Sequence, residues 1–202
     1  MIMMRTILSG IMLTIVLAGG AGLSWAAFKQ EGHLKAEDGL SRDDSNRRYF
    51  TDLAVMTHEG KEVKFYTDLL RDHVVLVSFF YTDCPTAQQD MMKLADIQDL
   101  LGDQMAKDVF IVALSVDPDK DNLKAIKSHA TKYKAGKGWT FITGKKEHIE
   151  TINYKLGNTN PVPEFHPRLY LLGNLRTGHW MKMNQHAPTP SVVEGLRVLA
   201  SE

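Results

Sequence analysis

The sequence contains one cysteine, Cys84, within the segment FFYTDCPTAQ (79–88). It follows a continuous apolar run (74–80) and precedes a segment with helical character that opens with Pro85. There the thiol would lie at the N-terminal end of a helix, where the helix dipole and free backbone N–H groups favour a thiolate. A thiolate attacks electrophiles and binds soft metal ions. The alternative role for a lone cysteine is that of a small buried apolar side chain.

A second candidate is His166, in the proline-rich segment PVPEFHPR (161–168) just before an expected strand. Such loops lie at the surface and can aim a side chain at a neighbouring helix start. The peptide bond between His166 and Pro167 could be cis, since X–Pro bonds adopt that form more readily than others. The alternative is an ordinary loop histidine.

The segment HWMKMNQH (179–186) is a third candidate. On a strand, His179, Met181 and Met183 would share one face, and His186 follows closely. Imidazole and thioether groups are suitable ligands for Cu(I). The alternative is a strand whose methionines fill the core.

Three aspartates in SVDPDKD (115–121) are spaced like possible cation ligands. Asp117, Asp119 and Asp121 lack the glycine and the distal glutamate of an EF-hand loop. The end of a strand followed by a helix N-cap explains them better.

Strands and helices are expected to alternate along the chain. A hairpin is expected within 51–66, strands at 74–80, 109–116, 139–143, 168–172 and 179–184, and helices at 85–101, 121–133, 145–156 and 188–201. This alternation favours parallel strands joined by right-handed crossovers, with an antiparallel hairpin near the C-terminus. The expected class is α/β: a thioredoxin-like fold with a central mixed sheet flanked by helices.

The N-terminus predicts export. Arg5 precedes an apolar stretch (6–27) that ends in Ser24-Trp25-Ala26, which is typical of a cleaved signal peptide or a retained membrane anchor. We expect a signal or anchor at 1–26, an extended linker at 27–50 and one domain at 51–202, located in a bacterial periplasm. The 202 residues carry a formal net charge of zero, which argues against nucleic acid as a partner.

Several of these segments resemble the Sco/SenC family of thioredoxin-like copper proteins. The similar stretches, which begin at about residue 62, are YTDCP (81–85), SVDPDKD (115–121), WTFITG (139–144) and, after His166, LYLLGNLRTG (169–178). Members use a CxxxC pair and a distant histidine to bind copper, and help to mature the copper centre of cytochrome c oxidase or handle thiols. The resemblance implies that Cys84 and His166 are copper ligands. Gln88 stands where the second cysteine is expected, so a thiolate and any dithiol cycle are lost.

The function expected from this resemblance is that of an exported copper-delivery protein, more a metallochaperone than an enzyme, with an incomplete Cys/His site. Its partner would be a membrane copper enzyme such as cytochrome c oxidase, or another copper protein. One alternative is a binding module that has kept the fold and lost the metal site. The other is a one-cysteine thiol peroxidase, although Tyr81 stands where peroxiredoxins have a threonine and no activating arginine is evident.

Overall fold

Strands and helices alternate in the computed structural model, which describes residues 41–202. The expected signal or anchor and most of the expected linker lie outside the described residues. The strands are β1 (Ala54–Thr57), β2 (Glu62–Lys64), β3 (Val74–Phe80), β4 (Val109–Ser115), β5 (Trp139–Thr143), β6 (Leu169–Asn174) and β7 (His179–Asn184). The longer helices are α1 (Arg42–Phe50), α2 (Ala87–Leu101), α3 (Leu123–Lys132), α4 (Lys146–Lys155) and α5 (Thr189–Ala200).

The seven strands form one mixed sheet in the order β2-β1-β5-β4-β3-β6-β7. Strands β3, β4 and β5 are parallel, and β6 and β7 complete one side as an antiparallel hairpin. The predicted crossovers and C-terminal hairpin are therefore both present, and the α/β fold class with a central mixed sheet is confirmed.

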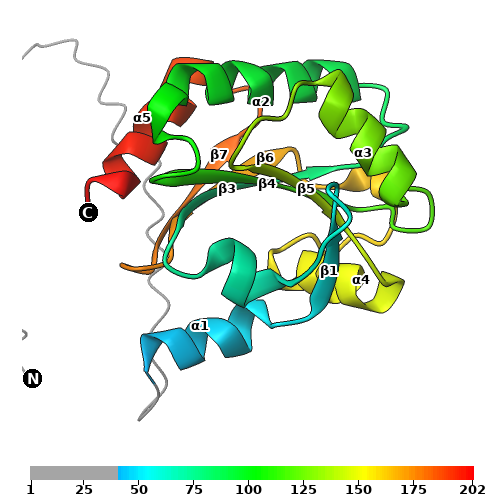
Figure 1. Cartoon of the computed structure of the whole chain (residues 1–202), viewed down its shortest axis with the longest axis horizontal. Coiled ribbons are helices and arrows are strands. Elements are labelled where there is room, and N and C mark those ends of the chain that lie inside the picture. Colours follow the sequence, from blue (N-terminus) through cyan, green and yellow to red (C-terminus); the bar gives the residue numbers. More distant parts are fainter. Residues whose placement is uncertain (1–40) are drawn as a thin grey trace, which may run out of the picture.

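Helices cover both faces of this sheet (Figure 1). One core lies between the sheet and α2, α3 and α5; the other lies between the sheet and α1, α4 and a short π-helix, η2 (Phe65–Leu70). All seven residues of β3 are buried because this strand is covered on both faces, which explains its uninterrupted apolar sequence.

Residues 42–50 correct the expected extended linker, because they form α1. Ser41 caps this helix by accepting a hydrogen bond from the Asp44 N–H at 3.1 Å. Phe50 is buried against Trp180, with ring centroids 5.3 Å apart. The segment is polar apart from its end, so its helix depends on capping and on one buried anchor rather than on an apolar period.

The expected hairpin within 51–66 is shorter than predicted. Strand β2 ends at Lys64, and the next residues, Phe65 and Tyr66, begin the π-helix η2 and are buried. Aromatic residues such as these are common in strands, but here they pack into the core from a helical turn. Within residues 41–202, none of the helices combines the length and apolar character needed to span a bilayer.

Candidate metal site

Sheet topology places the Cys84 turn and the His166 loop at one edge. Strand β6 runs antiparallel to β3, with Tyr170 opposite Ser78. The end of β3 therefore lies beside the start of β6. Because Cys84 follows the first and His166 precedes the second, residues 82 positions apart in the sequence reach the same side of the sheet.

Cys84 lies in a tight turn rather than in the first turn of a helix. Its backbone N–H donates to the Tyr81 carbonyl at 3.2 Å, and its own carbonyl accepts from the Ala87 N–H at 2.9 Å. Helix α2 begins at Ala87, two residues later than predicted from Pro85. The Cys84 side chain is partly buried and is a free thiol.

His166 is held by its own loop. Its side chain is buried, and Nδ1 lies 2.7 Å from the Pro163 carbonyl oxygen. A carbonyl only accepts, so Nδ1 carries the proton and Nε2 holds the lone pair of the neutral ring. Burial lowers the pKa of His166 and keeps the ring neutral, which is the form that binds metal. The bond to Pro167 is not cis, contrary to the possibility raised by the sequence.

Tyr81 lies between the two candidates. Its ring packs edge-on against the His166 ring, with centroids 5.7 Å apart. Burial, followed by the charge and hydrogen bond of Cys84, raises the pKa of Tyr81 to about 12. Tyr81 therefore packs against His166 and lies close enough to Cys84 for that residue to influence its pKa.

Thr86 gives Cys84 a polar neighbour that the sequence analysis did not identify. The Thr86 Oγ1 atom lies 3.2 Å from the Cys84 sulfur and donates to the Asp90 carboxylate at 2.9 Å. Arg168 donates to the same Oγ1 at 2.7 Å and forms two bonds to Asp90, at 2.9 and 3.1 Å. A charged residue at the start of an otherwise apolar strand was the available signal for Arg168.

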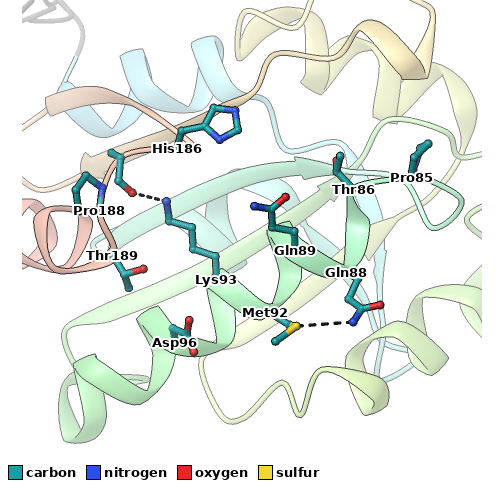
Figure 2. A pocket seen from close by; sticks show the side chains of 11 residues that line it. Pro85, Thr86, Gln88, Gln89, Met92, Lys93, Asp96, His186, Pro188 and Thr189 are labelled. Atoms are coloured by element: carbon teal, nitrogen blue, oxygen red, sulfur yellow. Dashed lines mark hydrogen bonds between the residues drawn. The ribbon is translucent and has the colours of Figure 1, made fainter.

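Gln88, which stands where the resemblance implies a second cysteine, interacts with a neighbour on its own helix. It is exposed on α2, and its Nε2 lies 4.0 Å from the Met92 sulfur, one turn further along the helix (Figure 2). Both line a shallow groove of about 610 Å³ beside the Cys84 turn. Among residues 41–202, no group of three or more His, Cys, Asp or Glu side chains is placed to hold a metal ion. Cys84 and His166 could offer a soft and a borderline donor, and within residues 41–202 no further His, Cys, Asp or Glu side chain joins them in such a group.

Asp121, in the aspartate segment, stabilises the turn that carries Cys84. Asp121 is fully buried and accepts from the Ser115 hydroxyl at 2.6 Å and from the backbone N–H and hydroxyl of Thr82 at 2.9 and 2.6 Å. It thereby fixes the residue two positions before Cys84. The N-cap of α3 is Asn122. The predicted strand end is confirmed, but the predicted capping by an aspartate is wrong, because Asn122 is the cap and Asp121 instead holds Ser115 and Thr82.

The residues of the third candidate do not gather into a site. Met181 and Met183 pack against α5, where a Cβ on Gly195 would come within 3.4 and 3.5 Å of them. His179 Nδ1 lies 2.6 Å from a Glu202 carboxylate oxygen. His186 is exposed, and its ring points away from Met92 across the groove (Figure 2). The packing of Met181 and Met183 thus agrees with the alternative in which these methionines fill the core.

With this fold and edge defined, comparison with known proteins identifies the class. The SCO1/SenC family model matches residues 42–159, more than half of the chain. The chain therefore belongs to the SCO1/SenC family.

Individual relatives agree with this assignment. A SCO1 protein homolog of Bacillus subtilis (strain 168) is 34% identical over 100 residues, which are 48% of this chain and 50% of that protein. The chain thus aligns with about half the length of this curated relative. A SCO1/SenC family lipoprotein from Bacillus anthracis shares the fold at a TM-score of 0.61 and 22% identity, covering 73% of this chain and 92% of the other. Arabidopsis thaliana ScoI, whose structure was solved with copper bound, shares the fold at a TM-score of 0.60 and 17% identity, and the match covers 74% of this chain and 96% of the other.

Proposed function

We propose that this protein binds copper through Cys84 and His166 and delivers it to a membrane copper enzyme such as cytochrome c oxidase, or to another copper protein. The observation that carries the proposal is the pairing of a free thiol and a neutral imidazole around Tyr81. Copper is the cargo favoured by this donor set, because thiolate and imidazole ligands select it over hard cations. Copper bound to the Arabidopsis relative supports the same choice.

The missing third donor predicts a weaker, more readily released ion. Gln88 offers an amide oxygen in place of a soft thiolate, so Cu(I) binding is expected to be weaker than in a three-ligand site. Weak retention suits a protein that gives its metal away. It also means that this chain cannot regulate copper through an internal disulfide, because Cys84 is its only cysteine.

We propose that delivery takes place outside the cytoplasm, in a bacterial periplasm. The basic and apolar N-terminal segment supports this, as does the description of the Bacillus anthracis relative as a lipoprotein. The surface around His166 suits contact with a protein: Phe165 is 69% exposed and Val162 41%, with Asp83 and Glu164 exposed nearby. Exposed aromatic side chains are frequent anchors in interfaces.

Competition titration with a Cu(I) chelator tests the proposal on the full chain. We expect the wild-type protein to bind one Cu(I) with submicromolar affinity, which corresponds to a dissociation free energy of about 8 kcal/mol or more. Cys84→Ser and His166→Ala should each weaken binding, and His186→Ala, which changes an exposed histidine, should not. Wild-type binding no tighter than that of the two site variants would contradict the proposal and favour a binding module without metal.

A thiol peroxidase is the second candidate, because the structure supplies the arginine that the sequence analysis found missing. Arg168 reaches Thr86, whose hydroxyl contacts the Cys84 sulfur. In this reaction the thiolate attacks hydrogen peroxide: an S–O bond forms, the O–O bond breaks, and the leaving hydroxide takes a proton to become water. The resulting sulfenic acid would be reduced by an external thiol. A Cys84 that reacts with peroxide no faster than free cysteine would exclude this function.

A further inference from the structure

We infer that Arg168 is a positioning residue for copper, acting through Thr86 and Asp90 to fix the Cys84 turn and the His166 loop relative to each other. This inference rests on the proposed copper function and adds residues to it. Arg168 stands two positions after His166, and Thr86 stands two positions after Cys84. One side chain therefore joins the two segments that carry the ligands.

The contacts of Arg168 have the geometry of a rigid connection. Its guanidinium forms two bonds to the Asp90 carboxylate, at 2.9 and 3.1 Å, and a third to Thr86 Oγ1 at 2.7 Å. Nη2 donates to both Asp90 oxygens and Nη1 donates to Thr86, so two nitrogens of one planar group hold two residues, which fixes orientation as well as distance. The Asp90 side chain is only 13% exposed and that of Arg168 34%, so water competes little for these bonds. A lysine could replace the charge but not the paired geometry.

Thr86 connects this pair to the sulfur. Its hydroxyl accepts from Arg168 and has a single hydrogen, which can go to Asp90 or to Cys84. While Cys84 is a thiol, its S–H can donate to Thr86 Oγ1, and the Thr86 hydroxyl can keep donating its own hydrogen bond to Asp90. When copper takes the place of the thiol proton, the sulfur becomes an acceptor and the hydroxyl can turn to it. Asp90 remains satisfied, because Arg168 still donates to both of its oxygens.

This arrangement compensates in part for the lost third ligand. With two protein donors, the affinity for copper depends strongly on whether sulfur and imidazole are held at a fixed separation, since each freely moving segment adds an entropy cost on binding. The Pro163 bond fixes the ring of His166 within its loop, and Arg168 fixes the loop to α2. Residues that orient metal ligands in this way typically change affinity about 10–100-fold when they are removed.

The test compares Arg168→Met with Arg176→Met in the full chain. Met keeps much of the length of the side chain and removes its charge and hydrogen bonds, and Arg176 is an exposed arginine just after β6. We expect Arg168→Met to weaken Cu(I) binding about 10–100-fold in the chelator competition, with Arg176→Met unchanged and Arg168→Lys between wild type and Arg168→Met. In the metal-free protein, the ¹⁵N signals of the His166 ring should broaden in Arg168→Met.

Thr86→Val provides a second variant that keeps the Arg168–Asp90 pair and the shape of the side chain. It should weaken Cu(I) binding less than Arg168→Met and shift the sulfur-to-copper charge-transfer band of the Cu(II) form. Two results would overturn this inference alone, provided that the wild type binds Cu(I). One is that Arg168→Met leaves both the Cu(I) affinity and the His166 signals unchanged, even if its melting temperature falls. The other is that Thr86→Val leaves the charge-transfer band unchanged. Wild-type binding no tighter than in Cys84→Ser would overturn the proposed function as well.

Discussion

At the scale of single residues, the proposed copper chemistry depends on one thiol, that of Cys84. The sequence identified Cys84 and His166 as candidates because an apolar strand and a proline-rich loop lead to them. It could not show that Tyr81 packs against His166, or that Arg168 reaches α2, because each of these contacts joins residues far apart in the chain. Whether Cys84 and His166 bind metal stays a prediction.

Gln88→Cys tests whether the missing ligand limits copper binding. The side chain is exposed on α2, four positions after Cys84, where a thiolate would add a soft donor. We expect tighter Cu(I) binding, by about tenfold or more, and a new internal disulfide on oxidation. The matched control is Gln89→Cys, at the next position on α2, where Figure 2 shows the side chain pointing in another direction. Equal gains in both variants would mean that any added thiol binds copper, without a site at Cys84.

Asp121→Ala tests the support beneath the Cys84 turn. The change leaves the partly buried Thr82 N–H and the buried Ser115 hydroxyl without their acceptor. We expect a loss of about 3 kcal/mol in the free energy of unfolding, measured with urea. Asp119→Ala removes an exposed carboxylate that pairs with Lys146 and should cost less than about 1 kcal/mol. Similar losses for the two variants would show that Asp121 carries no special structural role.

At the scale of elements, the hydrophobic pattern predicted those strands and helices whose formation depends on burying apolar side chains. The five predicted strands from β3 to β7 and helices α2 to α5 are all present, with ends shifted by up to two residues. Helix α1 was not predicted, because of its two buried residues only Phe50 is apolar and the other, Asn46, is polar. The π-helix η2 was mistaken for strand because Phe65 and Tyr66 suit both.

Gly173→Ala tests the packing of the β6–β7 hairpin. Gly173 faces Trp180 on the neighbouring strand, and an added Cβ would come within 2.5 Å of the indole ring. The ring cannot move away without disturbing Phe50 of α1. We expect a loss of about 1–3 kcal/mol in urea unfolding. Gly144→Ala is the control, since its Cβ would make contacts of 3.4 Å or longer. A neutral Gly173→Ala would contradict this tight packing.

Helix α3 should make folding sensitive to acid through His129. This residue stacks on Phe80, and burial, with a smaller contribution from Lys132, lowers its pKa; the nearby carboxylate of Asp83 opposes this shift. The unfolded chain therefore binds more protons just below about pH 6.5, and stability falls as the pH drops through this range. Urea unfolding at about pH 7 and 5.5 should show a smaller acid loss in His129→Leu. His58, whose pKa burial also lowers, should keep part of the loss. An unchanged acid loss in His129→Leu would refute the prediction.

At the scale of the whole molecule, membership of the SCO1/SenC family agrees with the sheet and its two helical layers. The fold brings the Cys84 turn and the His166 loop to one edge, and Arg168 joins them there. The proposed copper site therefore consists of one thiol and one imidazole, Cys84 and His166, at this edge of the sheet.

X-ray absorption at the copper edge, on the full chain loaded with one equivalent of Cu(I), tests this claim most directly. We predict a sulfur and an imidazole nitrogen as protein ligands, with the sulfur signal absent in Cys84→Ser, the imidazole signal absent in His166→Ala, and both retained in His186→Ala. A spectrum that is the same in the wild type, Cys84→Ser and His166→Ala would contradict the account.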